Sequence, residues 1–326
     1  MKKVLGIGNA LVDVMTPLKD DSIIEQLGFA RGSMNLVDEN KSREIKELTA
    51  RYASSMASGG SAANTIHGIS KMRAESGFIG AIGDDTTGKI FEKDMKAAGV
   101  ETYLCTKEDD TGTAVAMVSK DGERTFATHL GAAEKLGADD LDRKVFAAYD
   151  YLYLEGYLIT DIELVERACT YAKDEGLKVA VDLASFNVVE AYRDRFSHII
   201  DNYTDIIFAN EYEAKAFTGK EAVEALEDLS ARCEIAVVKT GARGSLIHDG
   251  NEIIKVGPMD VKSIDTTGAG DLYAAGFLYG LANNAPLKEC GFFGTLLASN
   301  IIQIIGPKIK SRDWPGIREE INEKLA

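Results

Sequence analysis

Residues 265 to 271 read Asp265-Thr266-Thr267-Gly268-Ala269-Gly270-Asp271 and stand directly before an apolar run, Leu272 to Leu281, that has helical spacing. The glycines on either side of Ala269 leave the backbone free to turn its N–H groups outward, and the positive end of the helix dipole adds to them. Such a turn can hold developing negative charge, and Asp271 is placed where a hydroxyl proton must be removed. These residues predict a site for phosphoryl transfer. A plain helix N-cap at Asp271 is the alternative, because Asp is a favoured capping residue.

Short apolar runs alternate with helical stretches along the rest of the chain. This order predicts an α/β sheet with helices on both faces. From Ile235 onward, three strands follow one another with a turn at 249–251, so we expect the sheet to end in an antiparallel meander. The expected strands are Val4 to Gly8, Gly77 to Ile82, Tyr151 to Glu155, Lys178 to Asp182, Asp205 to Ala209 and Ile235 to Lys239, and the expected helices are Thr87 to Ala98, Asp161 to Glu175, Glu211 to Thr218 and Gly268 to Leu281.

Two segments depart from this alternation. Thr111 to His129 reads as two strands joined at Asp121-Gly122, and residues 14–38 are polar with weak periodicity. We expect a small β lid, formed from approximately 14–38 and 99–129, that covers the substrate and excludes water. An edge hairpin of the main sheet is the alternative for Thr111 to His129.

Composition limits the classes of partner. The chain has 326 residues, 45% of them hydrophobic, with 37 basic and 52 acidic side chains and a net charge of −15. This balance argues against binding to nucleic acid or to an anionic membrane. Four cysteines without Cys-x-x-Cys spacing argue against a zinc site or a disulfide framework. With no signal segment and no long apolar run, we expect a cytoplasmic protein, and both a monomer and a homodimer remain open.

Several motifs occur in a fixed order ahead of Asp271, and together they resemble the ribokinase-like (PfkB) carbohydrate and nucleoside kinase family over nearly the whole chain. The resemblance implies a single domain over residues 1–326, folded as a three-layer α/β/α ribokinase-like sandwich with a mostly parallel central sheet and a small β lid. It also implies ATP and Mg²⁺ as cofactors, and leaves a monovalent cation such as K⁺ open. The motifs are Gly8-Asn9-Ala10-Leu11-Val12-Asp13, Gly59-Gly60-Ser61-Ala62-Ala63-Asn64, Gly77 to Gly88, Asn210-Glu211-Tyr212-Glu213 and Lys239-Thr240-Gly241-Ala242-Arg243-Gly244.

The acceptor site is expected near the end of the first strand. Asp13 can accept hydrogen bonds from two neighbouring sugar hydroxyls, and ligands of open α/β sheets bind at such strand ends. A turn or capping Asp is the alternative. Gly59 and Gly60 would allow close approach of the backbone, while Asn64 offers an amide. Tyr157 can stack on a base or belong to the core. The substrate-binding residues that we expect are Asn9, Asp13, Gly59, Gly60, Asn64 and Tyr157.

The donor site is expected at the next strand ends. Glu213 can hold Mg²⁺ through waters, since this ion usually binds through one carboxylate plus phosphates, or it can cap its own helix. Arg124 can swing over the γ-phosphate when the lid shuts, although a surface arginine is equally ordinary there. Besides Glu213 as the metal residue, the cofactor-binding residues that we expect are Asn210, Lys239, Thr240, Gly241, Gly244 and Thr266, and the catalytic residues are Asp271, Gly268, Ala269, Gly270 and Arg124.

The expected reaction is in-line transfer of the γ-phosphoryl group of ATP to a hydroxyl, with Asp271 as the base. Several details are similar to the adenosine kinase-like branch of the family: Asn9, the long interval between Asp13 and Gly59, and the segments around His129 and Tyr157. This similarity implies the 5′-hydroxyl of adenosine as the acceptor. Thr267 departs from the Asn that animal-type adenosine kinases tend to have there. A PfkB-type sugar kinase acting on ribose, fructose or 2-keto-3-deoxygluconate is the alternative. A catalytically silent nucleoside or sugar sensor is the second alternative.

Overall fold

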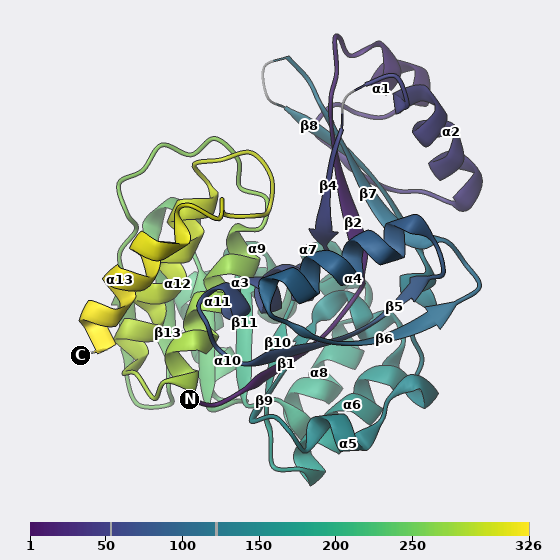
Figure 1. Cartoon of the computed structure of the whole chain (residues 1–326). Helices are drawn as coiled ribbons and strands as arrows, with labels where there is room; N and C mark the ends of the chain where they lie inside the picture. Colours follow the sequence, from purple (N-terminus) through teal and green to yellow (C-terminus); the bar gives the residue numbers. More distant parts are fainter. Residues whose placement is uncertain (53, 121–122, 326) are drawn as a thin grey trace.

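The larger of two sheets runs through the middle of the molecule (Figure 1). The computed structural model describes residues 1–52, 54–120 and 123–325. In this sheet the strands lie in the order β14-β13-β12-β11-β10-β9-β1-β5-β6. Neighbours from β6 to β12 are parallel, and β13 and β14 are antiparallel. The bounds are β1 Val4–Ile7, β5 Ser76–Gly83, β6 Glu101–Lys107, β9 Tyr151–Glu155, β10 Lys178–Asp182, β11 Ile206–Asn210, β12 Ile235–Lys239, β13 Ser245–His248 and β14 Ile253–Val256.

Helices cover both faces of this sheet. Strand β1 shows the division, because Val4 packs into one apolar core while Leu5 and Ile7 pack into the other. One layer contains α3 Ser61–Lys71, α4 Thr86–Ala98, α11 Ala269–Ala282, α12 Leu287–Ile301 and α13 Trp314–Leu325. The other layer contains α5 Arg143–Phe146, α6 Ile162–Asp174, α8 Arg193–Tyr203, α9 Glu211–Thr218 and α10 Ala222–Ser230. The three-layer α/β/α architecture, the mostly parallel sheet and its antiparallel end are therefore confirmed.

Short helices fill several connections at the sheet edge. They are α7 Phe186–Ala191 and the 3-10 turns η1 Ala132–Lys135, η2 Ala138–Asp140, η3 Gly156–Thr160 and η4 Gly241–Arg243. Of these, η3 and η4 follow directly after β9 and β12, so they lie where the parallel strands end.

A second sheet stands apart from the body, with strand order β3-β8-β7-β2-β4 (Figure 1). Its strands are β2 Leu11–Pro17, β3 Met34–Leu36, β4 Ser55–Gly59, β7 Thr111–Val118 and β8 Arg124–Gly131. Helices α1 Ser22–Leu27 and α2 Glu39–Thr49 pack on it through a small core of their own that includes Ile24, Ile45 and Met117. The hairpin β7–β8 belongs to this sheet and not to the edge of the main sheet. We call this sheet with α1 and α2 the lid.

The extent of the lid differs from the ranges expected from the sequence. Residues 101–107 form β6, which pairs with β5 in the large sheet from Glu101 to Lys107. Residues 39–59, which we did not expect in the lid, supply α2 and β4. The sequence of β4, Ser-Met-Ala-Ser-Gly, has little strand character, and its conformation follows from pairing with β2. The expected turn at Asp121-Gly122 lies outside the described residues.

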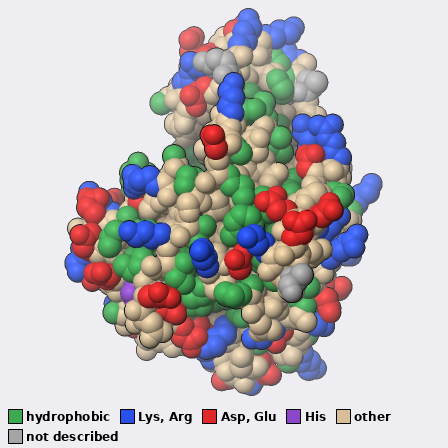
Figure 2. All heavy atoms as spheres, turned by 90° about the vertical axis from the view of Figure 1, so that its left-hand side faces the viewer, with side chains coloured by type: hydrophobic (Ala, Val, Ile, Leu, Met, Phe, Trp, Pro, Cys, Tyr) green, Lys and Arg blue, Asp and Glu red, His purple; other side chains and the backbone are tan. Residues whose placement is uncertain are grey.

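The surface carries charges of both signs. Figure 2 shows acidic and basic side chains interspersed over one face of the body, with the lid as a narrower projection above it. None of the helices in the described ranges combines the length and the apolar character needed to cross a bilayer.

Candidate active site

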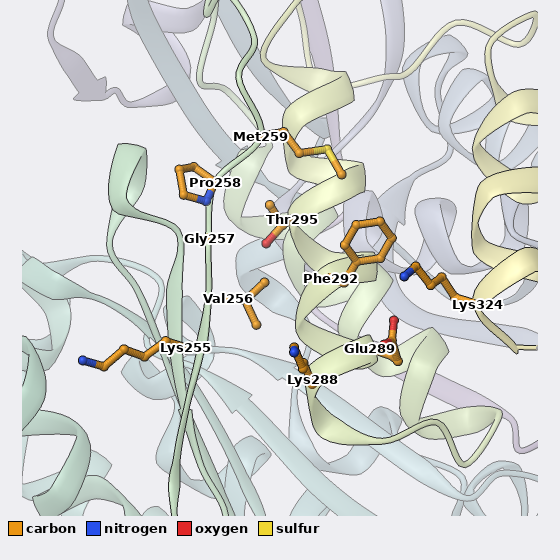
Figure 3. A pocket seen from close by; sticks show the side chains of 10 residues that line it. All are labelled: Lys255, Val256, Gly257, Pro258, Met259, Lys288, Glu289, Phe292, Thr295 and Lys324. Carbon is orange, nitrogen blue, oxygen red and sulfur yellow. The ribbon is translucent and has the colours of Figure 1, made fainter.

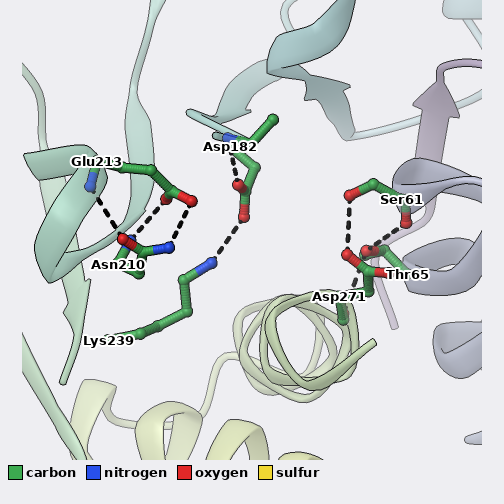
Figure 4. Close-up of polar contacts among 8 residues, drawn as sticks. Ser61, Thr65, Asp182, Asn210, Glu213, Lys239 and Asp271 are labelled. Atoms are coloured by element: carbon green, nitrogen blue, oxygen red, sulfur yellow. Dashed lines mark hydrogen bonds and ion pairs between the residues drawn. The ribbon is translucent and has the colours of Figure 1, made fainter. Parts of the chain in front are cut away.

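Asp271 lies in the first turn of α11, where Gly268 in the left-handed conformation begins the helix. Ser61 Oγ donates to Asp271 Oδ1 at 2.8 Å (Figure 4). Asn64 Nδ2 donates to Asp271 Oδ2 at 3.0 Å. Burial raises the pKa of Asp271 to about 6, against the lowering influence of these two hydrogen bonds. The carboxylate is therefore held by two donors from α3 and titrates close to neutral pH. This geometry goes beyond a capping role, because α11 has no side-chain cap hydrogen bond.

The start of α3 depends on the two glycines before it. Gly60 has φ of 94°, and a side chain there would clash with the carbonyl oxygen of Asn9. Thr65, one turn into α3, donates to the main-chain oxygen of Asp271 at 3.1 Å. The turn at Gly59-Gly60 thus brings α3 against the first turn of α11, and the two sequence motifs meet there.

Asp13 lies within β2, opposite Ala57 of β4, and is neither a turn residue nor a helix cap. Its carboxylate packs against Gly59, where a side chain would overlap it. No hydrogen bond or ion pair reaches this carboxylate from the residues that the structure describes. Burial raises the pKa of Asp13 to about 7, opposed by the positive charge of Lys308. An unpaired carboxylate beside a glycine backbone is well suited to accept hydrogen bonds from hydroxyl groups of a ligand.

Glu155, at the end of β9, lies beneath this region and was not expected from the sequence. Its Oε1 accepts from Asn9 N at 2.9 Å and from Asn9 Nδ2 at 2.6 Å, and its Oε2 accepts from Ala62 N at 2.8 Å. Glu155 is 2% exposed, and burial raises its pKa to about 7. Glu155 thereby ties the segment after β1 to the start of α3. The Asn9 side chain points to this buried carboxylate.

Lys239, at the end of β12, points into the molecule. Its Nζ donates to Asp182 Oδ2 at 2.9 Å (Figure 4). A Cβ at Gly270 would lie 3.3 Å from the same Nζ. Burial would lower the pKa of Lys239, but the charges of Asp182 and Glu213 outweigh it and raise this pKa. A positive charge therefore lies beside the glycine turn that begins α11.

Asn210 and Glu213 form a reciprocal cap at the start of α9. Glu213 Oε2 accepts from Asn210 N at 2.7 Å, and Oε1 accepts from Asn210 Nδ2 at 2.6 Å (Figure 4). Burial raises the pKa of Glu213 to about 7. The structure thus contains the capping arrangement that the sequence left open. Each carboxylate oxygen has a second lone pair, so the cap leaves room for contact with a metal-bound water.

Across the described ranges, no three His, Cys, Asp or Glu side chains are grouped closely enough to form a metal centre of their own.

Arg124, at the start of β8, connects the lid to the body. It forms an ion pair with Asp265, and its Nη1 donates to Thr267 Oγ1 at 3.0 Å. Both charged side chains are buried. Arg124 therefore lies at the turn that precedes Asp271, and its guanidinium contacts the turn itself.

The remaining expected residues lie in three places. Thr240, Gly241 and Gly244 form a tight turn after β12, in which Thr240 N and Oγ1 both donate to Gly244 O at 2.8 and 3.0 Å. Thr266 is exposed, and its carbonyl accepts from Ala269 N at 3.1 Å. Tyr157 lies in η3, directly after Glu155, and burial together with the charges of Glu155 and Asp271 raises its pKa.

A pocket of about 350 Å³ opens between β14 and α12 (Figure 3). Its wall at 256–258 adjoins the turn after β12, because a side chain at Gly244 would overlap the backbone of these residues. Thr295 is buried, and its hydroxyl has no partner within the described ranges. The pocket therefore lies beside the turn after β12. It is lined by Lys255, Val256, Gly257, Pro258, Met259, Lys288, Glu289, Phe292, Thr295 and Lys324.

Some site residues were missed from the sequence for different reasons. Asp182 and Glu155 are acidic side chains at the carboxyl ends of predicted parallel strands, and that position alone was a usable signal. Ser61 lies in the motif of residues 59–64, one turn before Asn64 on the same helix. Lys308 follows α12 in an irregular segment, and no local pattern marks it.

Comparisons with known proteins agree with this geometry. The chain is 34% identical to adenosine kinase from Sinorhizobium meliloti, with a TM-score of 0.87 and 99% of both chains covered. It is 32% identical to a probable sugar kinase from Rhizobium etli, with a TM-score of 0.89, covering 100% of this chain and 99% of that one. Adenosine kinase from Schizophyllum commune is 26% identical, with 97% of this chain and 98% of the relative covered. Residues 33–314 match the pfkB family carbohydrate kinase model, so the chain belongs to that family and is a phosphotransferase with an alcohol group as acceptor.

Proposed function

We propose that this kinase transfers the γ-phosphoryl group of ATP to a nucleoside, at the 5′-hydroxyl of adenosine. The observation that carries the proposal is the carboxylate of Asp271, held by Ser61 and Asn64 at a glycine-initiated helix start. Kinases of this family use ATP, so the donor follows from the family and the acceptor is the open question.

Asp13 would hold the acceptor. Its unpaired carboxylate can accept hydrogen bonds from two neighbouring ribose hydroxyls, and the backbone of Gly59 and Gly60 allows the sugar to approach closely. The Asn64 amide, whose Oδ1 is buried and unpartnered within the described ranges, offers a further contact to the sugar. In this arrangement the hydroxyl to be phosphorylated would point towards Asp271.

The chemical step needs a base and a stable site for negative charge. The acceptor oxygen forms a bond to the γ-phosphorus while the bond from that phosphorus to the β,γ-bridging oxygen breaks, and ADP leaves. The hydroxyl proton passes to the Asp271 carboxylate. Backbone N–H groups of Gly268, Gly270 and Asp271 and the ammonium of Lys239 beside Gly270 would stabilise the transferring group.

The donor would lie along the turn at 239–244, with its base directed to the pocket between β14 and α12 (Figure 3). Apolar side chains such as Val256 and Phe292 suit a purine face, and the Thr295 hydroxyl offers a polar contact. Glu213 would hold Mg²⁺ through waters, and the ion would supply neutralising charge for the phosphates. Arg124 would add positive charge from the lid.

Exposed apolar side chains support a nucleoside over a free sugar. Met34 and Leu36 on strand β3 of the lid are 68% and 72% exposed, and Phe186 on α7, just beyond the end of β10, is 47% exposed. A purine base presents apolar faces that such side chains can cover, and Tyr157 would add an aromatic contact. The similarity to the Sinorhizobium meliloti adenosine kinase supports the same acceptor.

A sugar kinase is the second candidate, favoured by the equal likeness to the Rhizobium etli protein. The experiment that separates the two is ADP release from ATP and magnesium with adenosine, inosine, ribose, fructose or 2-keto-3-deoxygluconate as acceptor. Asp271→Asn is measured alongside. The matched control is Asp84→Asn, because Asp84 is an exposed carboxylate that forms a surface ion pair with Lys89.

We expect turnover with adenosine that falls by about 10² to 10⁴-fold in Asp271→Asn and stays unchanged in Asp84→Asn. If ADP is released only with a free sugar, the acceptor is a sugar and not adenosine, and the proposed mechanism at Asp271 still holds. Binding of adenosine without ADP release in any mixture would instead identify a nucleoside sensor.

A further inference from the structure

Glu155 is a buried carboxylate that the proposed mechanism does not use. It ends β9, a strand inside the large sheet, and N–H donors converge on both of its oxygens. Oε1 accepts from the main-chain and side-chain nitrogens of Asn9 at 2.9 and 2.6 Å, and Oε2 accepts from Ala62 N at 2.8 Å. A carboxylate presents only acceptors, so it can bind donors on both sides. An amide in its place would turn its own N–H groups towards one of them.

These donors belong to two of the chain segments that join the lid to the body. Asn9 lies between β1 of the large sheet and β2 of the lid, and Ala62 lies in the first turn of α3, shortly after β4 of the lid. The two segments also touch, because a side chain at Gly60 would overlap the carbonyl oxygen of Asn9. A side chain at Gly8 would overlap both Glu155 and Ala62. Glu155 thus clamps the two segments together, and Gly8 makes room for it.

Both segments carry residues of the proposed site. Strand β2 contains Asp13, the carboxylate proposed to hold the acceptor. Helix α3 contains Ser61 and Asn64, which donate to the two carboxylate oxygens of Asp271. A shift of one segment against the other would therefore move the acceptor carboxylate relative to the base.

We propose that Glu155 is a positioning residue that fixes the segment leading to Asp13 against the start of α3, and so aligns the acceptor with the base. Asn9 belongs to the same clamp through its side-chain hydrogen bond to Glu155. Glu155 is 2% exposed and its Oε1 already has two donors, so it acts through these segments and not by touching the acceptor. The inference rests on the proposed function, which assigns Asp13 to the acceptor and Asp271 to the hydroxyl proton.

The test compares Glu155→Gln with the parent protein, both as the full chain. Amide hydrogen exchange reports on the clamp, and the KM values for the acceptor and for ATP report on the site. The acceptor is whichever compound of the panel gives ADP release with the parent. Measurements are made at about pH 8, because burial raises the pKa of Glu155 to about 7 and the carboxylate is ionised above that value.

Asp205→Asn is the matched control. Asp205 stands directly before β11, at the opposite end of the same parallel sheet, and is likewise a buried carboxylate. It also has three donors, which are Val179 N, Lys173 Nζ and Lys178 Nζ. Asn9→Ala, which removes one of the donors to Glu155, replaces Glu155→Gln if that variant does not fold.

We expect amides of residues 9–13 and 61–65 to exchange faster in Glu155→Gln, because Asn9 and Ala62 lose a shared acceptor. The KM for the acceptor should rise about tenfold, while the KM for ATP changes by less than about twofold. Asp205→Asn should lower stability and leave both KM values in place. A smaller folded fraction alone lowers the apparent kcat without changing KM, so the KM for the acceptor separates positioning from stability.

Unchanged exchange at Asn9 and Ala62 would overturn the clamp, and an unchanged KM for the acceptor, or equal changes in both KM values, would overturn the positioning role. Glu155→Gln combined with Asn9→Ala should be no worse than Glu155→Gln alone. Multiplied losses would overturn the place of Asn9 in the clamp and show a direct contact with the acceptor. Failure of the proposed function would appear separately, as a parent protein that releases no ADP with any acceptor, and hydrogen exchange would then still decide whether the clamp exists.

Discussion

At the scale of single residues, the base makes the pH dependence predictable. Asp271 can accept a proton only when ionised, and burial raises its pKa to about 6, so kcat should rise with pH through about 6 and level off above it. The hydrogen bond from Ser61 lowers this pKa. We therefore expect Ser61→Ala to move the midpoint of kcat to higher pH, by up to about one unit.

The control for Ser61→Ala is Thr65→Val, measured in the same pH series. Thr65 donates to the main-chain oxygen of Asp271 and not to its carboxylate, so its loss should leave the midpoint in place. Equal shifts in the two variants would mean that a general loosening of α3, and not the hydrogen bond to the carboxylate, sets the midpoint.

The second residue-scale prediction concerns the buried pair of Arg124 and Asp265. Asp265 also accepts from Thr267 N and Gly306 N, so Arg124→Met would leave a buried, hydrogen-bonded carboxylate without its charged partner. Removing one member of a buried pair costs about 3–5 kcal/mol, and removing both costs less. We expect Arg124→Met to lower the free energy of unfolding by about that amount, and Asp265→Asn in the same chain to restore part of it.

Chemical denaturation of the two single variants and the double variant measures this coupling. Burial would raise the pKa of Asp265, but its hydrogen bonds, including that from Arg124, outweigh burial and lower it. The stabilisation is thus present above the unfolded pKa of about 3.9 and is lost as pH falls through the lower folded value. Additive effects at pH 7 would show that the pair contributes no coupling energy.

At the scale of elements, the crossing of α11 and α12 depends on a glycine. A Cβ at Gly276 would overlap the backbone of Phe293, so the two helices approach more closely than a side chain allows. We expect Gly276→Ala to destabilise the protein by about 1–3 kcal/mol. In contrast, Gly316→Ala in α13 meets nothing within 4 Å and should stabilise by about 0.5–1 kcal/mol. Thermal unfolding of both variants measures these changes in stability. Equal changes in the two variants would show that helix propensity, and not the packing of α11 on α12, determines the effect of each substitution.

The elements that the sequence predicted correctly are those whose pattern is local. Strands such as Lys178–Asp182 are continuous apolar runs, and α11 follows a glycine turn, so a short window contains the information. Strand β4 and the place of β6 depend on partners far along the chain, and no window around either contains them. The same distinction holds in the site. Asp271 stands in a contiguous motif, whereas Glu155 and Lys308 acquire their neighbours only through the fold.

At the scale of the whole molecule, the chain consists of a body with two large apolar cores and a lid with a small one. The lid core includes Leu18, Ile23 and Val115, and it is separate from the cores on the two faces of the large sheet. Regions with few buried apolar side chains open locally at lower free energy than large cores do. The contact of Arg124 with Asp265 and Thr267 is one of the links that hold the lid to the body.

Hydrogen exchange should therefore divide the molecule along the same line. We expect backbone amides of β3, β4 and β8 to exchange faster than those of β1, β9 and β10, which lie inside the large sheet.

Adenosine with a non-hydrolysable ATP analogue should slow exchange in the lid far more than in the body, because contacts with the bound ligands would order the lid. Asp13→Asn, which weakens the acceptor contact on β2, should remove the part of this protection that depends on adenosine and leave exchange in β9 and β10 unchanged. Two results would contradict this prediction: equal exchange rates in lid and body, or exchange in the lid that neither ligand slows. Either would mean that the second sheet is a fixed extension of the core and does not close over the acceptor.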